Sequence, residues 1–417
     1  MIPSIRRNLL KIQLIGGKDF KKCLHITSSV AKERNESSCY SDRIQTIKDL
    51  LDNSTSFVET SPKETQDEWT TLPYAEGTLM SKQEKHDLGS VRTKVDPRDT
   101  SIILFPGEGA QFVGMARSAV NVPVAKDVFD YASEILKYDL LNLCNNGPKV
   151  QLNDIRYSHV AIMTASLANL EMLREERPDA VLNCVATAGF SLGEITALVF
   201  AGALQFDEAL QLVQIRAEAI HAANEIHKGG MATIYYGPDS EVKKACIAAK
   251  EWCIKNKFEK AECFVSNYMY PKCKIISGSE EALQYFEENL EKFRIRTIQR
   301  IKNAQAAHCR LMEPTIEPLR QALKQMIVSD PIIRVYSNVS AKPYANAKHI
   351  EKLLPQQLVK AVRWEQTMHN MFARRRGEYF PRTIVCGPNV VLKNILFRVN
   401  LKAFRQSIHI GDVKQKK

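Results

Sequence analysis

Apolar and polar positions along the chain become regular only from residue 101 onwards. The segment 101–111, SIILFPGEGAQ, passes from an apolar run of strand length into a Pro/Gly turn. Residues 181–187 have the composition of a second buried strand, with helical composition before and after it, at 161–173 and 195–203. Because strands that alternate with helices form parallel sheets, this part of the chain predicts an α/β fold.

A long helix is predicted over 207–225, with Asp207 as its N-cap. Gly229 and Gly230 interrupt the helical pattern. Between 231 and 301 the expected elements follow in the order β-α-β-β-α-β, which is typical of a ferredoxin-like unit. The elements expected in the rest of the larger domain are a helix at 313–326 and strands at 333–337 and 383–386.

The N-terminal part of the chain lacks this patterning. Residues 1–30 are basic and poor in acids, with Ile, Leu and Phe between the charges and hydroxyl residues at the end. This composition is typical of a mitochondrial transit peptide, and a disordered basic tail or a cytosolic helix is the alternative. Residues 32–96 are rich in Ser, Thr, Lys, Glu and Asp, and only 44–51 has the apolar spacing of a short helix.

The expected fold is a parallel-sheet, α/β-hydrolase-like large domain with an inserted small ferredoxin-like domain. A chain of 417 residues with 44% apolar content can bury both cores. The expected boundaries are a transit peptide at 1–31, a largely disordered leader and linker at 32–97, a discontinuous large catalytic domain at 98–228 and 304–404, the small domain at 229–303, and a basic C-terminal tail at 405–417.

Charge and cysteine content narrow the chemistry. The formal net charge of +11 favours acidic partners, such as nucleic acid, phosphorylated cofactors or an acidic protein, without choosing among them. No stretch approaches the roughly 20 uncharged apolar residues needed to cross a bilayer, so no membrane insertion is expected. The ten cysteines include no CxxC pair and no Cys/His group with zinc spacing, so reduced thiols and no metal site are expected. Cys309, beside His308, is interpreted as a packing residue, because adjacent side chains on an extended segment point to opposite faces.

The pentapeptide at 189–193, GFSLG, is a GxSxG sequence between the second predicted strand and the helix after it. Glycines on either side of a serine permit the strained strand-to-helix turn that exposes its hydroxyl, and the helix N-terminus offers backbone N–H groups to a developing oxyanion. On its own, the pentapeptide fits an accidental glycine-rich turn as well as it fits a nucleophilic serine.

Three further motifs occur in register with it: FPGEGAQFVGM at 105–115, IRAEAI at 215–220 and AAHCRLMEP at 306–314. Together with GFSLGE, these motifs resemble the malonyl-coenzyme A:acyl carrier protein transacylase family. The resemblance is closest to the mitochondrial members, which also carry Phe before the nucleophile. It extends over 102–400 and includes weaker matches in SNYMYPKCKIISG, QQLVKAVRW and CGPNVVLKNIL.

The resemblance implies a catalytic pair. Ser191 would attack a thioester carbonyl, and His308 would take its proton, because an unaided alkoxide is inaccessible at neutral pH. The main-chain carbonyl of Gln357 would orient the imidazole. The backbone amides of Leu192 and Glu108 would form the oxyanion hole.

A pocket selective for malonyl over acetyl needs a cation that is always charged and grips two oxygens, and arginine meets both conditions. The resemblance assigns this role to Arg216. Weaker candidates for substrate contacts are Gln111, Asn267 and Arg363, each of which is equally well explained as a structural hydrogen bonder. The arginines at 294, 296, 300 and 374–376 are candidates for coenzyme A phosphates or an acidic carrier surface, although solvated charge is the commoner explanation.

The sequence departs from the family's pattern at three places. Glu108 replaces the usual glutamine of the FPGxG turn, His159 lies in a segment that usually reads Gln-Pro, and Ala361 replaces a usual proline. The change at Ala361 leaves an acid such as Glu351 as an alternative to Gln357. The other two departures motivate a rival interpretation, in which a catalytically weakened family member is kept as an interaction protein.

The expected reaction is a ping-pong transfer, in which malonyl-coenzyme A loads Ser191 and the phosphopantetheine thiol of acyl carrier protein removes the malonyl group. No metal or redox cofactor and no nucleic acid partner are expected, and a monomer is the default state. The basic leader and the resemblance imply the mitochondrial matrix and a role in mitochondrial fatty acid synthesis. A serine thioesterase or hydrolase of the α/β-hydrolase type is the other alternative, because GxSxG fits both classes.

Overall fold

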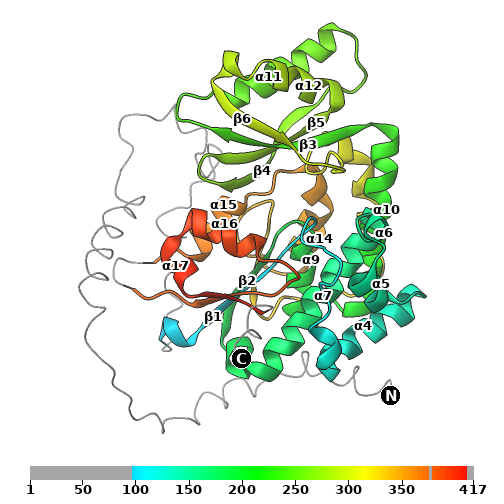
Figure 1. Ribbon diagram of the computed structural model, residues 1–417, viewed down its shortest axis with the longest axis vertical. Coiled ribbons are helices and arrows are strands. Elements are labelled where there is room, and N and C mark those ends of the chain that lie inside the picture. Colours follow the sequence, from blue (N-terminus) through cyan, green and yellow to red (C-terminus); the bar gives the residue numbers. More distant parts are fainter. Residues whose placement is uncertain (1–95, 375–377, 411–417) are drawn as a thin grey trace.

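The computed structural model describes residues 96–374 and 378–410. The predicted transit peptide, the predicted helix at 44–51 and nearly all of the predicted linker lie outside the described residues. Figure 1 shows two sheets in separate parts of the molecule, one in its lower half and one at the top. Each sheet has a hydrophobic core of its own.

The large sheet is parallel throughout. Its strands are β1 Ser101–Phe105, β2 Cys184–Gly189, β7 Arg334–Tyr336, β8 Arg382–Val385 and β9 Ser407–His409, in the order β7-β2-β1-β8-β9. The central strand β1 is buried along its whole length. Its continuous apolar run, SIILF, follows from this position, because both faces of a parallel sheet are covered.

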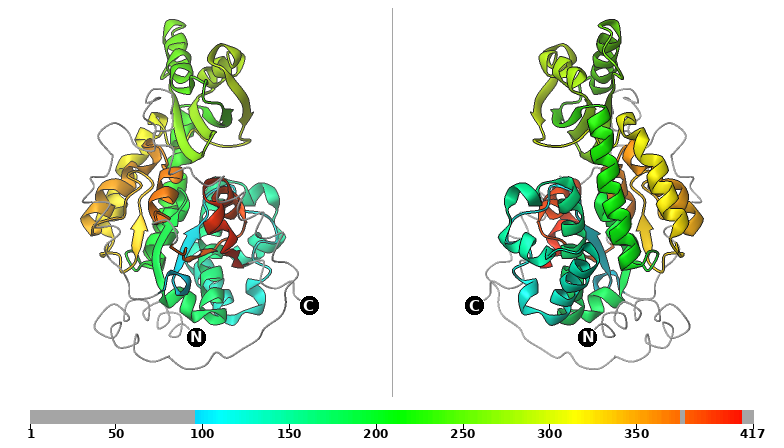
Figure 2. Two further views of the ribbon diagram at one scale, coloured as in Figure 1. Left: turned by 90° about the vertical axis from the view of Figure 1, so that its left-hand side faces the viewer. Right: turned by 90° about the vertical axis from the view of Figure 1, so that its right-hand side faces the viewer.

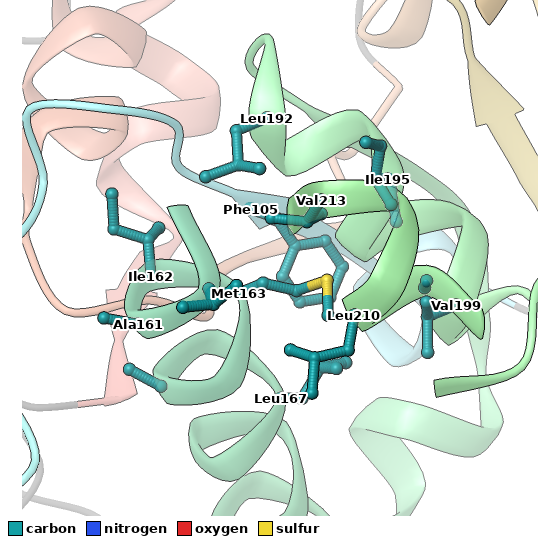
Figure 3. Close-up of a cluster of buried hydrophobic side chains, with 14 of the residues drawn as sticks. Phe105, Ala161, Ile162, Met163, Leu167, Leu192, Ile195, Val199, Leu210 and Val213 are labelled. Atoms are coloured by element: carbon teal, nitrogen blue, oxygen red, sulfur yellow. The ribbon is translucent and has the colours of Figure 1, made fainter. Parts of the chain in front are cut away.

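Alternate side chains of β1 point to opposite faces of the sheet, and each face has its own helices. On one face, Ile103 and Phe105 belong to a cluster that includes residues of four helices. These helices are α4 Pro123–Leu136, α7 Ile155–Glu176, α9 Leu192–Phe200 and α10 Phe206–Ile226. Figure 3 shows the ring of Phe105 among side chains of α7, α9 and α10, including Met163, Ile195 and Val213.

On the other face, Ile102 and Leu104 pack with α15 Trp364–Met371, α16 Val391–Val399 and α17 Leu401–Arg405. The shorter elements of the large domain are α5 Leu140–Asn146, α6 Lys149–Leu152, α8 Pro178–Leu182, α13 Ile316–Gln325, α14 Ala347–Leu353 and the 3-10 turns η3 Pro97–Asp99, η4 Ala119–Asn121, η6 Arg310–Thr315 and η7 Leu354–Val359. None of the helices described in 96–374 and 378–410 is long and apolar enough to cross a membrane.

The small domain is an antiparallel sheet with two helices. Its elements are β3 Gly229–Tyr236, α11 Val242–Lys255, β4 Cys263–Tyr270, β5 Cys273–Ser279, α12 Glu280–Glu288, η5 Glu291–Phe293 and β6 Ile295–Arg300. The strand order β4-β5-β3-β6 is the ferredoxin-like arrangement. Figure 2 shows α10 running from the large domain up to this sheet. The predicted fold class, a parallel α/β sheet with a separate small antiparallel sheet, is therefore confirmed.

Two predictions about the ends of elements are wrong: the start of the second strand and the N-cap of the long helix. The predicted strand over 181–187 starts too early, because α8 ends at Leu182 and β2 begins at Cys184. Pro178 opens α8, since its missing N–H is not needed at a helix N-terminus. Asp207 is not an N-cap but lies in the first turn of α10, where its charge complements the helix dipole.

The C-terminal end of the described chain belongs to the large sheet. Residues 407–409 form β9, which pairs in parallel with β8, and both Ser407 and His409 are buried. The predicted basic tail at 405–417 is therefore wrong for this segment. A three-residue strand with one apolar side chain between two polar ones has too short a pattern to be recognised in the sequence.

Candidate active site

Ser191 lies at the turn between β2 and α9, which is the strand-to-helix context that GxSxG requires. Its φ of 51° lies in the left-handed region, which is unfavourable for a residue with a side chain. Helix α9 also touches strand β1 directly, because a Cβ on Gly193 would lie 2.3 Å from the carbonyl oxygen of Phe105. The tight turn places the serine at the carboxyl end of β2 and at the N-terminus of α9.

The nucleophile, the base and its orienting group form one hydrogen-bonded series. Oγ of Ser191 lies 2.8 Å from Nε2 of His308, and Nδ1 of His308 lies 2.8 Å from the main-chain oxygen of Gln357. Because a carbonyl oxygen can only accept, Nδ1 carries the ring proton and Nε2 is free to accept the serine proton. This is the geometry that a general base needs for nucleophilic catalysis.

His308 is held in an environment that keeps it neutral. It is 2% exposed and precedes η6 with a φ of 61°. Burial and the positive charge of Arg216 lower the pKa of His308 to about 4. At neutral pH the imidazole is therefore unprotonated, which is the form that accepts a proton.

Arg216 reaches the nucleophile from α10 and is 3% exposed. Its Nη2 donates to Oγ of Ser191 at 2.9 Å and to Oε1 of Gln357 at 3.3 Å, while Nη1 donates to Nδ1 of His159 at 3.2 Å. Burial lowers the pKa of Arg216 to about 10, which leaves it charged at neutral pH. Among residues 96–374 and 378–410, no carboxylate forms an ion pair with this guanidinium, so the buried cation is suited to an anionic group of a substrate.

A buried carboxylate that the sequence analysis missed lies in the first turn of α9. Glu194 accepts hydrogen bonds from the hydroxyl of Tyr344 at 2.6 Å, from the N–H of Asn338 at 3.2 Å and from the side-chain amide of Gln357. Burial raises the pKa of Glu194 to about 7 in spite of these bonds. The sequence could have indicated a buried carboxylate here, because Glu194 is the one charged residue in the apolar helix LGEITALVF.

Asn338, also missed, holds the turn on both sides of the nucleophile. Its Oδ1 accepts from the N–H of Ser191 at 2.7 Å, and its Nδ2 donates to the carbonyl oxygen of Gly189 at 2.7 Å. No local pattern points to it, because it lies 147 residues from Ser191 in the chain. Asn338 thereby fixes the turn and removes the N–H of Ser191 from the groups available to an oxyanion.

The proposed oxyanion donors are the N–H groups of Leu192 and Glu108. Leu192 is the first residue of α9, where N–H groups have no partner within the helix. In the part of the chain that the structure describes, neither of the two N–H groups has an acceptor, whereas the next one, of Gly193, donates to the carbonyl oxygen of Phe190 at 2.9 Å. Unpaired N–H groups beside the nucleophile support the oxyanion assignment.

The carboxylate of Glu108 contacts His159. Its Oε2 lies 3.3 Å from Nε2 of the imidazole, and the carboxylate side chain is 38% exposed while the imidazole is fully buried. Although burial opposes it, the hydrogen bond from His159 and the charge of Arg216 hold the pKa of Glu108 below its usual value. Two of the three departures from the family's pattern therefore touch each other.

Within the described residues, the three weaker substrate candidates make no direct hydrogen bond to Ser191, His308 or Arg216. Gln111 makes hydrogen bonds within its own loop and to the turn before α7. Asn267, in β4, pairs with Val362 where the small sheet meets the large domain. The N–H of Arg363 donates to the main-chain oxygen of Asn338 at 2.9 Å. None of these hydrogen bonds reaches the nucleophile or the base.

Other candidate groups play no part in this arrangement. Glu351 is exposed on α14, and the main chain of Gln357 takes the place beside His308. Cys309 is buried and donates to the main-chain oxygen of Ala306, and burial raises the pKa of its thiol to about 11. No group of three or more His, Cys, Asp and Glu side chains within 96–374 and 378–410 is arranged to hold a metal ion.

Comparison with known proteins identifies relatives over this whole region. Residues 102–379 match the family model of the acyl transferase domain. The chain is 50% identical over 319 residues to the probable malonyl-CoA-acyl carrier protein transacylase, mitochondrial, of Drosophila melanogaster, with 76% of this chain and 84% of that protein covered. It is 45% identical over 309 residues to the malonyl-CoA-acyl carrier protein transacylase, mitochondrial, of Homo sapiens, with 74% and 79% covered.

Solved structures with the same fold come from related proteins. The malonyl CoA-acyl carrier protein transacylase of Coxiella burnetii superimposes with a TM-score of 0.67 at 27% identity, covering 76% of this chain and 95% of that one. A malonyl-transacylase in complex with its type II PKS acyl-carrier protein superimposes with a TM-score of 0.65 at 29% identity, covering 73% and 94%. The matched region includes the elements that carry Ser191, Arg216 and His308.

Proposed function

This chain belongs to the malonyl-CoA-acyl carrier protein transacylase family of acyl transferases, and we propose that its Ser191 carries the malonyl group from malonyl-CoA to acyl carrier protein. One observation carries the assignment of residues: the buried hydrogen-bonded series from Gln357 through His308 to Ser191 continues to Arg216. It places a base on one side of the nucleophile and a cation for the substrate's carboxylate on the other.

In the first half-reaction, Oγ of Ser191 attacks the thioester carbonyl carbon of malonyl-CoA while its proton passes to Nε2 of His308. The charge that develops on the carbonyl oxygen is held by the N–H groups of Leu192 and Glu108. The carbon–sulfur bond then breaks, the coenzyme A thiolate takes the proton from Nε2, and the malonyl group is left as an ester on Ser191.

In the second half-reaction, the phosphopantetheine thiol of acyl carrier protein gives its proton to His308 and attacks the ester carbonyl. The ester carbon–oxygen bond breaks, and Ser191 regains its proton from Nε2. The carbonyl oxygen of Gln357, which faces Nδ1–H, stabilises the imidazolium that forms in each half. Atoms and protons balance without a metal or a redox group.

Selectivity for malonyl rests on Arg216. A malonyl group differs from an acetyl group by its terminal carboxylate, and a guanidinium can bind both oxygens of that group. Nη2 of Arg216 lies 2.9 Å from the oxygen that becomes acylated, close to where the carboxylate of a bound malonyl group must lie. An acetyl group would leave this buried cation without an anionic partner, which is unfavourable.

The mitochondrial relatives and the basic N-terminal residues support a mitochondrial protein, and we place it in the matrix, where it would supply malonyl groups for fatty acid synthesis. Acyl carrier protein is the acceptor, by analogy with the family and with the solved complex. Expression of the tagged full chain followed by subfractionation of mitochondria tests the compartment. A protein found only in the cytosol would contradict it.

Hydrolysis and a non-catalytic role are both less consistent with the site. The group that orients His308 is a main-chain carbonyl rather than the carboxylate expected of an α/β-hydrolase triad. A buried cation beside the nucleophile also favours an anionic acyl group. The non-catalytic alternative does not explain why nucleophile, base and cation are assembled within hydrogen-bonding distance of one another.

Intact-protein mass spectrometry of the full chain mixed with malonyl-CoA tests the proposal. We expect one malonyl adduct that reduced carrier protein discharges, no adduct in Ser191→Ala and a weaker one in Arg216→Ala. Free malonate released without carrier protein would indicate a hydrolase. Absence of an adduct in the wild-type chain, with coenzyme A binding retained in calorimetry, would overturn the transfer mechanism.

A further inference from the structure

Glu108, His159 and Arg216 form a contact series that the reaction above does not use. Glu108 lies in the turn after β1, His159 in α7 and Arg216 in α10, so three separate elements bring them together. The imidazole lies in the middle, with the guanidinium on its Nδ1 side and the carboxylate on its Nε2 side. The carboxylate and the guanidinium do not pair directly within 4 Å.

Hydrogen-bond chemistry fixes the state of the imidazole. A guanidinium can only donate, so Nδ1 of His159 must accept from Arg216. The ring proton of the neutral imidazole then lies on Nε2, where it points to the carboxylate of Glu108. A proton on Nδ1 would face the guanidinium, which is unfavourable. In this fully buried ring, Nδ1 therefore accepts from Arg216 and Nε2 donates to Glu108.

The Glu108 carboxylate is a potential competitor of the substrate. It is an anion close to a buried cation that has no carboxylate partner among the described residues. Its side chain is 38% exposed, so packing does not fix it on every side. If this carboxylate paired with Arg216, it would occupy the donors that a malonyl carboxylate needs.

We propose that His159 is a positioning residue that holds the Glu108 carboxylate away from Arg216 and so keeps the guanidinium available for the carboxylate of the substrate. The inference rests on the proposed function, because it assumes that Arg216 binds the malonyl group. It also explains why the two departures from the family's pattern occur together: a charged side chain in the turn after β1 is compatible with the site only when a donor at position 159 restrains it.

The test compares loading of Ser191 by malonyl-CoA and acetyl-CoA in the full chain. His159→Phe keeps a ring in the buried space and removes both nitrogen contacts. We expect its kcat/KM for malonyl-CoA to fall at least about tenfold, mainly through KM, while acetyl loading stays within about threefold. Glu108→Gln alone is measured as the reference for the double variant, because it removes the charge but keeps the backbone N–H and an amide oxygen that accepts from Nε2–H.

The double variant Glu108→Gln/His159→Phe tests whether the Glu108 carboxylate competes with the substrate for Arg216. Removing the charge should restore at least about threefold of the malonyl loading lost in His159→Phe, since no carboxylate is left to compete for Arg216. Equal losses for malonyl and acetyl, or no recovery in the double variant, would overturn the proposal. Asp130→Asn is the matched control, because it removes a carboxylate from an exposed pair with Lys126 on α4 and should change neither rate.

A second variant covers the case in which His159→Phe does not fold. His159→Asn keeps an acceptor near the Nδ1 position for Arg216 and removes the donor to Glu108, and its malonyl loading should also fall and recover with Glu108→Gln. Acylation of Ser191 in the wild-type chain tests the proposed function separately from the role of His159. Without a malonyl adduct on Ser191 the proposed function fails, whereas an adduct without recovery in the double variants refutes only the role of His159.

Discussion

Nη2 of Arg216 lies 2.9 Å from Oγ of Ser191, so the buried cation contacts the nucleophile directly. Because the guanidinium only donates, Oγ accepts from it and directs its own proton to Nε2 of His308. A nearby positive charge also favours the alkoxide that forms when this proton leaves. In the proposed mechanism, Arg216 first assists the nucleophile and then binds the carboxylate of the acyl group.

Replacing Arg216 should therefore affect both acyl groups, but unequally. We expect Arg216→Ala to lower kcat/KM for malonyl-CoA on the order of 100-fold, because a buried charge pair is lost. Acetyl-CoA loses only the assistance to Ser191, so its decrease should stay below about tenfold. Single-turnover acylation with each thioester measures the ratio. Equal decreases for the two thioesters would show that Arg216 does not bind the malonyl carboxylate.

The pH dependence of acylation reports on His308. Its pKa is lowered from 6.5 to about 4, so the neutral base should persist well below the pH at which an exposed histidine is protonated. The acidic limb of kcat/KM for malonyl-CoA should therefore fall below about pH 5. Intrinsic fluorescence over the same range separates this limb from acid unfolding. An inflection at the ordinary histidine pKa would contradict the environment described here.

Glu194 should make stability depend on pH in the opposite sense to a salt-bridged carboxylate. Its pKa is raised from 4.5 to about 7, so the folded state binds a proton that the unfolded state has released within this window. The free energy of unfolding should therefore decrease as pH rises through the window, by about 3 kcal/mol in total. Urea unfolding of wild type and Glu194→Gln at about pH 5 and about pH 8 isolates this contribution. A difference between the two proteins that is independent of pH would refute it.

Gly193 should tolerate no side chain. A Cβ there would lie 2.3 Å from the carbonyl oxygen of Phe105, so Gly193→Ala must push α9 away from β1. We expect a loss of stability of at least about 3 kcal/mol or failure to fold, and loss of acylation. Gly230→Ala is the control, because its Cβ would come no closer than 3.4 Å to the side chain of Arg300. Calorimetric unfolding of both variants provides the comparison.

Much of the fold could be predicted because its signals are local. The apolar run of β1 and the GxSxG turn occupy consecutive residues, and the elements of the small domain follow one another along the chain. The ends of elements were less predictable. The short strand β9 was interpreted as a tail, because its burial depends on pairing with β8 and not on its own three residues.

Local patterns in the sequence are sufficient to predict the α/β class, the small inserted sheet and the position of Ser191 on a strand-to-helix turn, because periodicity and glycine placement act over a few residues. Which distant groups meet at that turn depends on the tertiary fold. Asn338 accepts from the N–H of Ser191 although 147 residues separate them, and Glu108 contacts His159 across 51 residues. Burial and hydrogen-bond pairing depend on the packing of the sheet against its helices, which no single segment encodes.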